Sequence, residues 1–110
     1  MAGASASLYA GQPATTTPAP TVFTAANKVL VKEIIVTNVT DASATVDVHF
    51  GVGGAAAAAA NAFMLGVLVP ARSVVIFALN KVMANTDVIR ARQATASALT
   101  VHVSGVTNAP

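Results

Sequence analysis

Few side chains in this sequence could take part in acid–base or metal chemistry, and it has no cysteine. Four acids and two histidines make up the candidates: Glu33, Asp41, Asp47, Asp87, His49 and His102. Asp47 and His49 are two residues apart, so a β-strand would place both on one face, where a neighbouring strand could add His102 and complete three metal ligands with one open position. The same spacing arises wherever polar residues alternate along a strand, so we expect three solvated or interface side chains and no metal or other cofactor.

No pattern typical of nucleophilic catalysis or of phosphate binding is present. No serine lies in a turn of the nucleophile-elbow type, and the glycines of residues 51–54 do not precede a helix with phosphate-binding spacing. Arg90 and Arg92 share one strand face and could grip a carboxylate or a phosphate, although a solvated face or a contact between subunits is the commoner use of such a pair. We therefore expect no catalytic residue and no enzymatic activity.

Charge is sparse along the chain. Charged residues make up 9% of it and hydrophobic residues 55%, whereas about 25% charged is usual for soluble domains. Such a chain has a weakly charged surface, which makes sense if neighbouring subunits cover much of it. The net charge of +2 is small and scattered, which predicts no nucleic-acid partner.

No membrane span or secretory signal is expected. The most apolar stretch, residues 63–79, is interrupted by Pro70, Arg72 and Ser73, so it is too short and too broken to cross a bilayer. The first seven residues have neither the basic nor the unbroken apolar region of a secretory signal.

The segments that would position the polar residues have the patterns of β-strands. Residues 44–52 alternate strictly, with Thr45, Asp47 and His49 on one face and an apolar set on the other: Ala44, Val46, Val48, Phe50 and Val52. Further strands are expected over 63–69, 73–79, 87–93 and 98–106, with a loop over 80–86. Six consecutive alanines within residues 51–61 predict a connection with room for one helical turn, because so short a helix cannot offset its nucleation cost.

Residues 29–39 form a β-branched run that is apolar on both faces, which predicts a central strand or one covered on both sides. Strict alternation places Leu30, Ile34 and Val36 opposite another apolar set: Val29, Val31, Ile35 and Val39. It also places Lys32 and Glu33 on opposite faces, so one of these two charges is expected to be buried and paired at a subunit contact. About five residues separate this run from the next, which suits a hairpin.

Residues 1–27 have a different composition, with Pro and Thr concentrated between 11 and 20. We interpret them as an extended N-terminal arm, with a disordered tail as the alternative. Two apolar pairs flank the Pro-rich part and are the expected partner-docking residues: Leu8, Tyr9, Val22 and Phe23. Residues 28–110 then form one all-β domain, an antiparallel β-sandwich or jelly-roll-like barrel of at least six strands.

The order of strands and turns over residues 20–106 resembles small β-sandwich virion proteins of tailed bacteriophages. Five segments carry the resemblance: Val22-Phe23-Thr24-Ala25-Ala26-Asn27-Lys28, Val31-Lys32-Glu33-Ile34-Ile35-Val36-Thr37-Asn38, Ala44-Thr45-Val46-Asp47-Val48, Val69-Pro70-Ala71-Arg72 and Leu99-Thr100-Val101-His102-Val103-Ser104-Gly105. The turn at residues 84–87 departs from the Gly-Asp turn of such proteins. The resemblance implies a subunit of a capsid decoration, head fibre or tail component, often trimeric, and it transfers no functional residue.

Together these features predict a non-enzymatic structural subunit located in a phage virion. The expected role is capsid decoration (cement), with a tail or fibre component as the second location. The expected partners are further copies of the chain, as a homotrimer, and a major capsid protein or a tail protein. The competing hypothesis is a glycan- or receptor-binding module, against which stand a single tyrosine and the lack of tryptophan.

Overall fold

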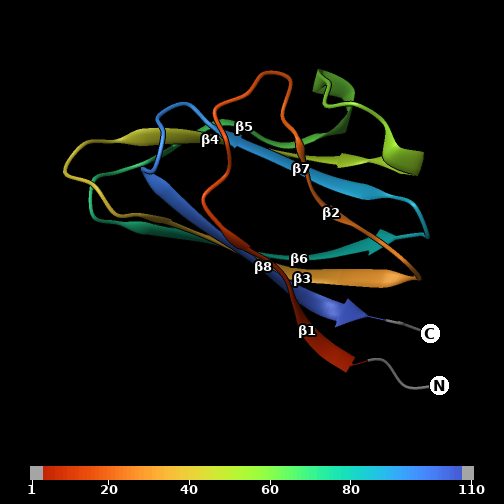
Figure 1. The fold of residues 1–110 in the computed structure, drawn as a ribbon. Coiled ribbons are helices and arrows are strands. Elements are labelled where there is room, and N and C mark those ends of the chain that lie inside the picture. Colours follow the sequence, from red (N-terminus) through yellow and green to blue (C-terminus); the bar gives the residue numbers. More distant parts are fainter. Residues whose placement is uncertain (1–3, 108–110) are drawn as a thin grey trace.

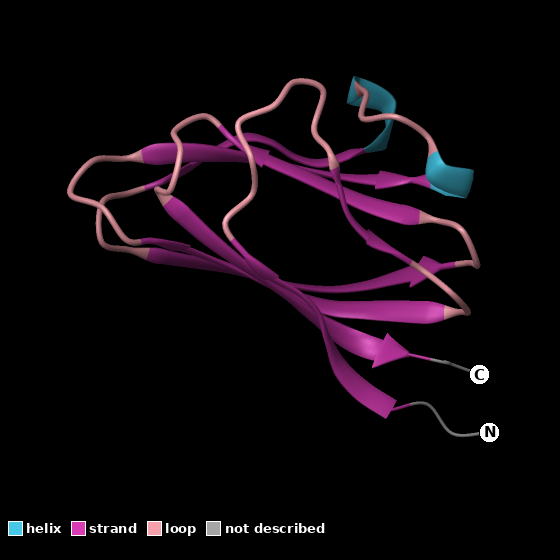
Figure 2. Ribbon diagram, in the orientation of Figure 1, coloured by secondary structure: helices cyan, strands magenta, loops and turns pink. Residues whose placement is uncertain are grey.

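The structure, a computed structural model, describes residues 4–107, which form eight strands and two short 3-10 turns. The strands are β1 (Ala4–Gly11), β2 (Thr21–Thr24), β3 (Val29–Asn38), β4 (Ala44–Gly51), β5 (Ala62–Val69), β6 (Val74–Met83), β7 (Val88–Gln93) and β8 (Leu99–Thr107). The 3-10 turns η1 (Val52–Gly54) and η2 (Ala59–Asn61) lie in the alanine-rich connection, drawn cyan in Figure 2. Within residues 4–107 no helix is long and apolar enough to cross a membrane.

The strands form two four-stranded antiparallel sheets that pack face to face, as Figure 1 shows. Sheet A has the order β1-β8-β3-β6, and sheet B has the order β2-β7-β4-β5. The all-β class and the β-sandwich are therefore confirmed. Among the described strands only β4 and β5 are consecutive in one sheet, so the hairpin expected from β3 and β4 is wrong. These two strands lie in opposite sheets, where each buries its apolar face against the other layer.

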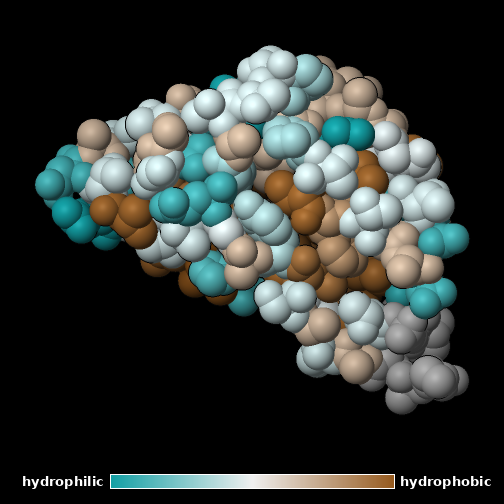
Figure 3. All heavy atoms as spheres, viewed as in Figure 1, coloured by the Kyte–Doolittle hydropathy of each residue, from teal (hydrophilic) through white to brown (hydrophobic). Residues whose placement is uncertain are grey.

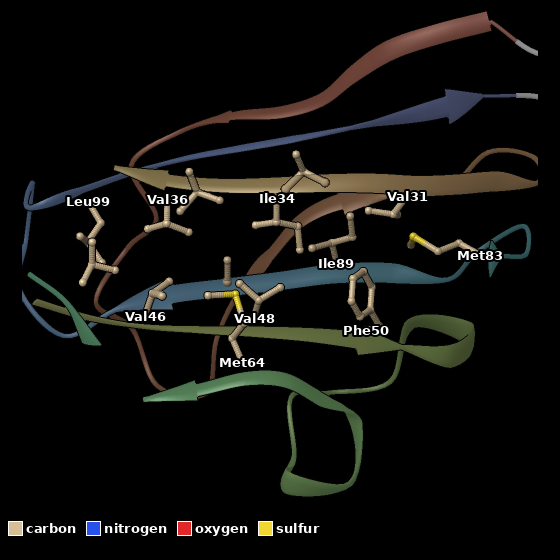
Figure 4. Close-up of a cluster of buried hydrophobic side chains, with 14 of the residues drawn as sticks. Val31, Ile34, Val36, Val46, Val48, Phe50, Met64, Met83, Ile89 and Leu99 are labelled. Atoms are coloured by element: carbon tan, nitrogen blue, oxygen red, sulfur yellow. The ribbon is translucent and has the colours of Figure 1, made fainter. Parts of the chain in front are cut away.

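The core lies between the central strands of the two sheets. In Figure 4, Val31, Ile34 and Val36 of β3 face the side chains that β4 contributes from the opposite layer. The expected inward set of β4 is confirmed from Ala44 to Phe50, whereas Val52 is exposed because the strand ends at Gly51. Burying one large apolar side chain is worth about 1.5–3 kcal/mol, so this layer provides most of the stabilisation. Residues of the other strands complete it: Met64, Met83, Ile89 and Leu99.

A β-bulge in β3 explains why this strand is apolar on both faces in the sequence. The register shifts between Val31 and Glu33 against both neighbouring strands, so the alternation changes phase there. Val29 and Val31 before the bulge and Ile34 and Val36 after it are therefore all buried. The strict alternation expected over residues 29–39 is wrong for that reason.

The same bulge directs both charges of β3 away from the core. Lys32 is exposed and donates from Nζ to Asn80 Oδ1 at 2.6 Å, and Glu33 is half-buried. Neither charge is buried within the chain itself, and burial of one of them at a subunit contact stays a prediction. On β8, Gly105 lies against the backbone of the bulge, where a Cβ would overlap the carbonyl oxygen of Leu30. The bulge therefore requires a residue without a side chain at position 105.

The expected N-terminal arm is not confirmed, because residues 4–24 contribute a strand to each sheet. β1 pairs with β8 along its whole length, and β2 pairs with β7. Residues 12–20 cross from sheet A to sheet B, drawn orange in Figure 1. The four apolar residues of the expected arm pack against the core of their own chain: Leu8, Tyr9, Val22 and Phe23. Residues 1–3 of that arm lie outside the described residues.

The C-terminal half follows the expected order of strands with one difference. The loop expected over residues 80–86 is shorter, since β6 continues to Met83. The register of β6 against β3 shifts at residues 79–80. Beyond this irregularity Met83 pairs with Val29, and its side chain is buried in the core. The alanine-rich connection contains two 3-10 turns instead of one helical turn, which agrees with the low expected helix content.

Candidate functional site

Four polar side chains gather on the outer face of sheet B, and we refer to them as the outer polar cluster: Asp47, His49, Arg90 and Arg92. Asp47 is paired with Arg92, and His49 with Arg90, across β4 and β7. All four alternate with inward apolar residues of their strands, which explains their shared orientation. Two connections of the same chain, residues 12–20 and 52–61, contact this cluster through the hydrogen bonds described next.

Arg92 and Asp47 form an ion pair that joins three segments. Arg92 Nη1 lies 3.1 Å from Asp47 Oδ2, and Arg92 Nη2 donates to the carbonyl of Thr15 at 3.2 Å. Asp47 Oδ1 accepts from the backbone N–H of Gly66 at 2.6 Å. Gly66 has φ of +63° at the point where β5 shifts register against β4, a conformation that favours glycine. The pair thus fixes both the crossing segment and the irregular edge strand.

Arg90 holds the two connections through backbone carbonyls. Its Nε donates to Ala55 at 2.9 Å, its Nη2 to Gly54 at 3.1 Å, and its Nη1 to Ala19 at 3.5 Å. A carboxylate or phosphate is usually gripped by two parallel N–H groups of one guanidinium edge. Here the Nε and Nη2 edge is occupied by the chain itself, so Arg90 acts as an internal clamp.

His49 is buried beneath the alanine-rich connection, with 4% of its surface exposed. Its Nδ1 lies 3.0 Å from both the carbonyl of Ala58 and Oδ1 of Asn61. The Asn61 amide is oriented by its own bonds, since Oδ1 accepts from Ala58 N–H and Nδ2 donates to the carbonyl of Ala56. Both neighbours of Nδ1 are therefore acceptors, and Nδ1 carries the proton. The solvated or interface side chain expected here is wrong, because a loop of the same chain covers His49 and strand periodicity does not show which outward residues a loop will cover.

The hypothetical metal site is not assembled. His102 is exposed on β8 of sheet A, whereas Asp47 and His49 belong to sheet B. Within residues 4–107 no three His, Cys, Asp or Glu side chains could hold a metal ion together. The cavity beside His49 and Arg92, about 270 Å³, is lined mostly by small or apolar side chains of the two connections. The outer polar cluster thus serves to order these connections.

Two buried amides also fix loops, and sequence patterns did not single them out. Gln93 Nε2 donates to the carbonyl of Pro13 at 2.6 Å, and Gln93 Oε1 accepts from the N–H groups of Ala98 and Leu99 at 3.2 and 2.7 Å. Asn38 Nδ2 donates to the carbonyls of Ala42 and Val69 at 2.8 and 3.0 Å. Asn38 and Gln93 are each the last residue of a strand. Each stands two positions after a buried residue, so its side chain also points into the sandwich. That position is the only signal in the sequence that could have found them.

Among residues 4–107, two titratable groups have shifted pKa values, and both shifts have structural causes. Backbone N–H groups of Gly53 and Ala84 donate to the Asp87 carboxylate at 2.9 Å each and lower its pKa. Burial raises the pKa of the Tyr9 hydroxyl. Asp87 links the η1 turn to the β6–β7 turn, so this shift also reflects loop anchoring.

The outer strands β5 and β6 present large apolar side chains to solvent. They are the edge strands of the two sheets on the same side of the sandwich, where the rings of Phe63 and Phe77 meet edge to face at 5.9 Å. Inward residues of β6 are only half-buried along this edge. We define the β5–β6 edge by its six exposed apolar residues: Phe63 40%, Leu65 61%, Leu68 58%, Val74 50%, Ile76 58% and Val82 53% exposed.

The residues expected to dock a partner lie on the other side of the molecule. Leu8 and Tyr9 belong to β1, and Val22 and Phe23 belong to β2, which are the opposite edges of sheets A and B. Figure 3 shows hydrophobic side chains, in brown, reaching the surface among polar ones on the viewed face. Five of the six residues that define the edge fall in expected strands, whereas Val82 was placed in the expected loop over residues 80–86. Periodicity alone does not indicate which strands lie at a sheet edge.

No protein-family model, curated protein or solved structure matches this chain. Among the described residues, the outer polar cluster and the β5–β6 edge are features from which a function can be argued.

Replacing Asp47 by alanine should destabilise the sandwich by about 1–3 kcal/mol, since Arg92 and the Gly66 N–H both lose their acceptor in a half-buried setting. The side chains of Arg92 and Asp47 are 23% and 16% exposed, whereas those of Arg72 and Asp41 are 65% and 87% exposed. Asp41→Ala is thus a matched control with an expected effect within about 0.5 kcal/mol. Urea denaturation compares the two, and equal losses would show that burial of the inner pair contributes nothing.

Proposed function

We propose that this chain is a non-enzymatic structural subunit of a bacteriophage virion. It self-associates as a homotrimer and decorates the capsid, with a tail or fibre component as the alternative location. The observation that carries the proposal is the β5–β6 edge, where six large apolar side chains are exposed on a chain with only 9% charged residues.

A structural role accounts for the use of the polar side chains. Arg90, Arg92 and Asp47 bind backbone groups or each other, and the Nδ1 of His49 bonds to its own loop. These contacts hold connections in place and leave no nucleophile, base and orienting group lined up towards a common point among the described residues. A rigid surface with ordered loops is what a subunit needs in order to dock repeatedly in one geometry.

Self-association is supported by the chemistry of the surface. Large apolar side chains that are exposed on two neighbouring edge strands mark a candidate interaction site. Sheet edges are commonly protected by charges, prolines or short strands, because their unpaired N–H and C=O groups can pair with other chains. β6 is ten residues long and is neutral from Val74 to Asn80, so this protection is missing beside the exposed Val74 and Ile76.

The virion location rests on the resemblance of residues 20–106 to phage β-sandwich proteins. A trimer of this sandwich presents its remaining surfaces, including the outer face of sheet B with its ordered connections, to a capsid or a tail. The partner of the trimer is then a major capsid protein or a tail protein, and no cofactor is required for the contact.

Purified particles of the phage that encodes the chain test this proposal directly. Quantitative mass spectrometry should find the chain in copy numbers comparable to the major capsid protein, and antibodies against it should label heads in electron micrographs. Far fewer copies with labelled tails would support the alternative location. Absence of the chain from purified particles would reject the virion assignment. Light scattering on the recombinant protein should independently give the mass of three copies.

A further inference from the structure

We propose that the cavity at one end of the β5–β6 edge binds a small aromatic carboxylate. The cavity measures about 500 Å³, within the range of about 300–1,000 Å³ in which small organic ligands bind. Residues from both layers line this end cavity: Phe50, Val52 and Phe63 beside sheet B, and Leu79, Asn80 and Lys81 on sheet A. The inference goes beyond the virion role and does not depend on self-association.

Lys81 is directed into the gap between the sheets, where a sandwich normally places apolar side chains. It pairs with Val31 of β3, and residues directly opposite each other on neighbouring strands point to the same side of the sheet. Val31 is fully buried, so Lys81 shares the inward side, although solvent reaches it at the open edge. Figure 4 shows Val31 and Phe50 on facing sheets at the same end of the core. Lys81 Nζ lies 5.8 Å from the centre of the Phe50 ring, a cation–π distance.

The ammonium group of Lys81 has no carboxylate at ion-pair distance among residues 4–107. Asp87 acts on it only from further away, because the N–H groups of Gly53 and Ala84 lower the pKa of Asp87 most and the charge of Lys81 lowers it least. Each of the two Asp87 oxygens already accepts from one of these N–H groups, at 2.9 Å. The carboxylate of a ligand would therefore be the close partner that Lys81 lacks.

The other charges of this region lie on the outer face of sheet A. Glu33 pairs with Ala78, an exposed outward residue of β6, so the sheet separates its carboxylate from the end cavity. Lys32 Nζ donates to Asn80 Oδ1 at 2.6 Å. The oxygen of the Asn80 amide is thus occupied, and the groups that remain for a ligand are the donors on Nδ2. The two lysines and these donors favour an anion over a cation at the cavity.

The exposed phenylalanine ring indicates that the apolar part of the ligand is aromatic. Phe63 is 40% exposed, and its ring meets the rings of Phe50 and Phe77 edge to face at 5.6 and 5.9 Å. A ligand ring can continue this arrangement, because aromatic rings favour such contacts beyond the burial of their area. Leu79 adds apolar contact from sheet A. A carboxylate on a short linker from that ring can then reach Lys81.

One wall of the end cavity is formed by the alanine-rich connection, through Ala60 and Asn61. The outer polar cluster holds this connection in place, since His49 Nδ1 lies 3.0 Å from Asn61 Oδ1 and Arg90 Nε donates to the carbonyl of Ala55 at 2.9 Å. The wall is therefore ordered before a ligand arrives, which reduces the entropic cost of binding.

Three related probes test the charge and the ring separately: 4-phenylbutanoate, its neutral amide 4-phenylbutanamide, and butanoate. In ¹⁵N-labelled protein, the amide resonances of Phe63 and residues 79–81 should shift on titration with 4-phenylbutanoate. The expected dissociation constant is about 0.1–1 mM, since so small a ligand gains little binding energy in total. The neutral amide and butanoate should each bind at least about tenfold more weakly, because one lacks the charge and the other lacks the ring.

Four substitutions locate the binding. Lys81→Met removes the charge but keeps the length of the side chain, so 4-phenylbutanoate should bind at least about tenfold more weakly, like the neutral amide. Arg72→Met is the matched control, because Arg72 lies in the turn before β6, at the other end of that strand. Ala60→Phe should block the cavity, whereas Ala56→Phe adds the same ring to the connection outside the cavity lining and should leave binding unchanged. All four positions are exposed, so melting temperatures should stay close to that of the unchanged protein.

Three results would overturn the proposal. Unchanged resonances at about 10 mM 4-phenylbutanoate would leave Lys81 as a charge that protects the sheet edge from pairing. Equal binding of the acid and the neutral amide would remove the assignment to an anion. Shifts at the same residues that follow protein concentration and not the probe would show that a second copy of the chain covers the cavity. None of these results affects whether the chain is found in purified particles, so the proposed function is tested separately.

Discussion

A variant lacking residues 1–20 should fail to fold stably. β1 covers one edge of β8, and Leu8 and Tyr9 pack against the core, so the deletion exposes apolar surface and removes a row of ladder hydrogen bonds. Half-burial of these two side chains is worth about 2–3 kcal/mol together, and the unpaired amide of Gln93 adds about 1–3 kcal/mol. That sum, about 3–6 kcal/mol, reaches the lower end of the stability of a small domain, about 5–15 kcal/mol.

Thermal unfolding followed by circular dichroism measures this effect. We expect a fall in melting temperature of about 20 °C or more, since each kcal/mol shifts the midpoint by about 4–8 °C in a domain of this size. Within β1, Tyr9→Ala should lower the melting temperature and Ser7→Ala should not, because Ser7 is exposed. A deletion variant that melts like the full chain would instead restore the interpretation of residues 1–27 as an accessory arm that docks on a partner.

Replacing Gln93 by alanine should cost about 2–5 kcal/mol, the second largest effect we expect. The side chain is 1% exposed and bonds three backbone groups: the carbonyl of Pro13 and the N–H groups of Ala98 and Leu99. Alanine leaves all three without their present partner in a dry environment, and a buried unpaired group costs about 1–3 kcal/mol. Since the lost bonds join the crossing segment to the β7–β8 turn, both connections should loosen.

Gln12→Ala is the matched control for Gln93→Ala. Gln12 also donates from its amide to a backbone carbonyl, that of Ser97 at 3.2 Å, but its side chain is exposed. Water can replace that bond, so the expected loss is within about 0.5 kcal/mol. Urea denaturation of both variants gives the comparison, and hydrogen exchange should show faster exchange at Ala98 and Leu99 only in Gln93→Ala. Similar stabilities for the two variants would argue that the buried amide is replaceable by solvent.

The strands that were predicted best are those with uninterrupted alternation. Residues 44–50 place their buried set as expected, because nothing disturbs the two-residue period of β4. β3 was predicted as a strand, but the division of its residues between two faces was wrong, because Val31 and Ile34 are buried on the same side. A bulge adds one residue to the period, and the sequence marks it only by Lys32 and Glu33 standing in an apolar run.

Pairing between distant segments accounts for what the sequence could not show. Nothing in residues 4–11 indicates that their partner is β8, and a Pro- and Thr-rich stretch is equally compatible with a tail or with a crossing between sheets. The outer polar cluster was recognised as pairs on shared faces, at Asp47 with His49 and at Arg90 with Arg92. Which loops cover these faces depends on tertiary contacts, so the internal role of the cluster became visible only in the fold.

The position of β8 inside sheet A affects how the protein is made. β8 lies between β1 and β3, yet it is the last of these strands to leave the ribosome. β1 therefore stays without its partner while about 90 residues are translated, and one side of β3 while about 60 are translated, at about 5–20 residues per second. Sheet A closes only when residues 99–107 emerge, so neighbouring nascent chains on one messenger are exposed to mispairing until that moment. Slow translation should favour aggregation of this chain, and a holdase chaperone should raise its soluble yield.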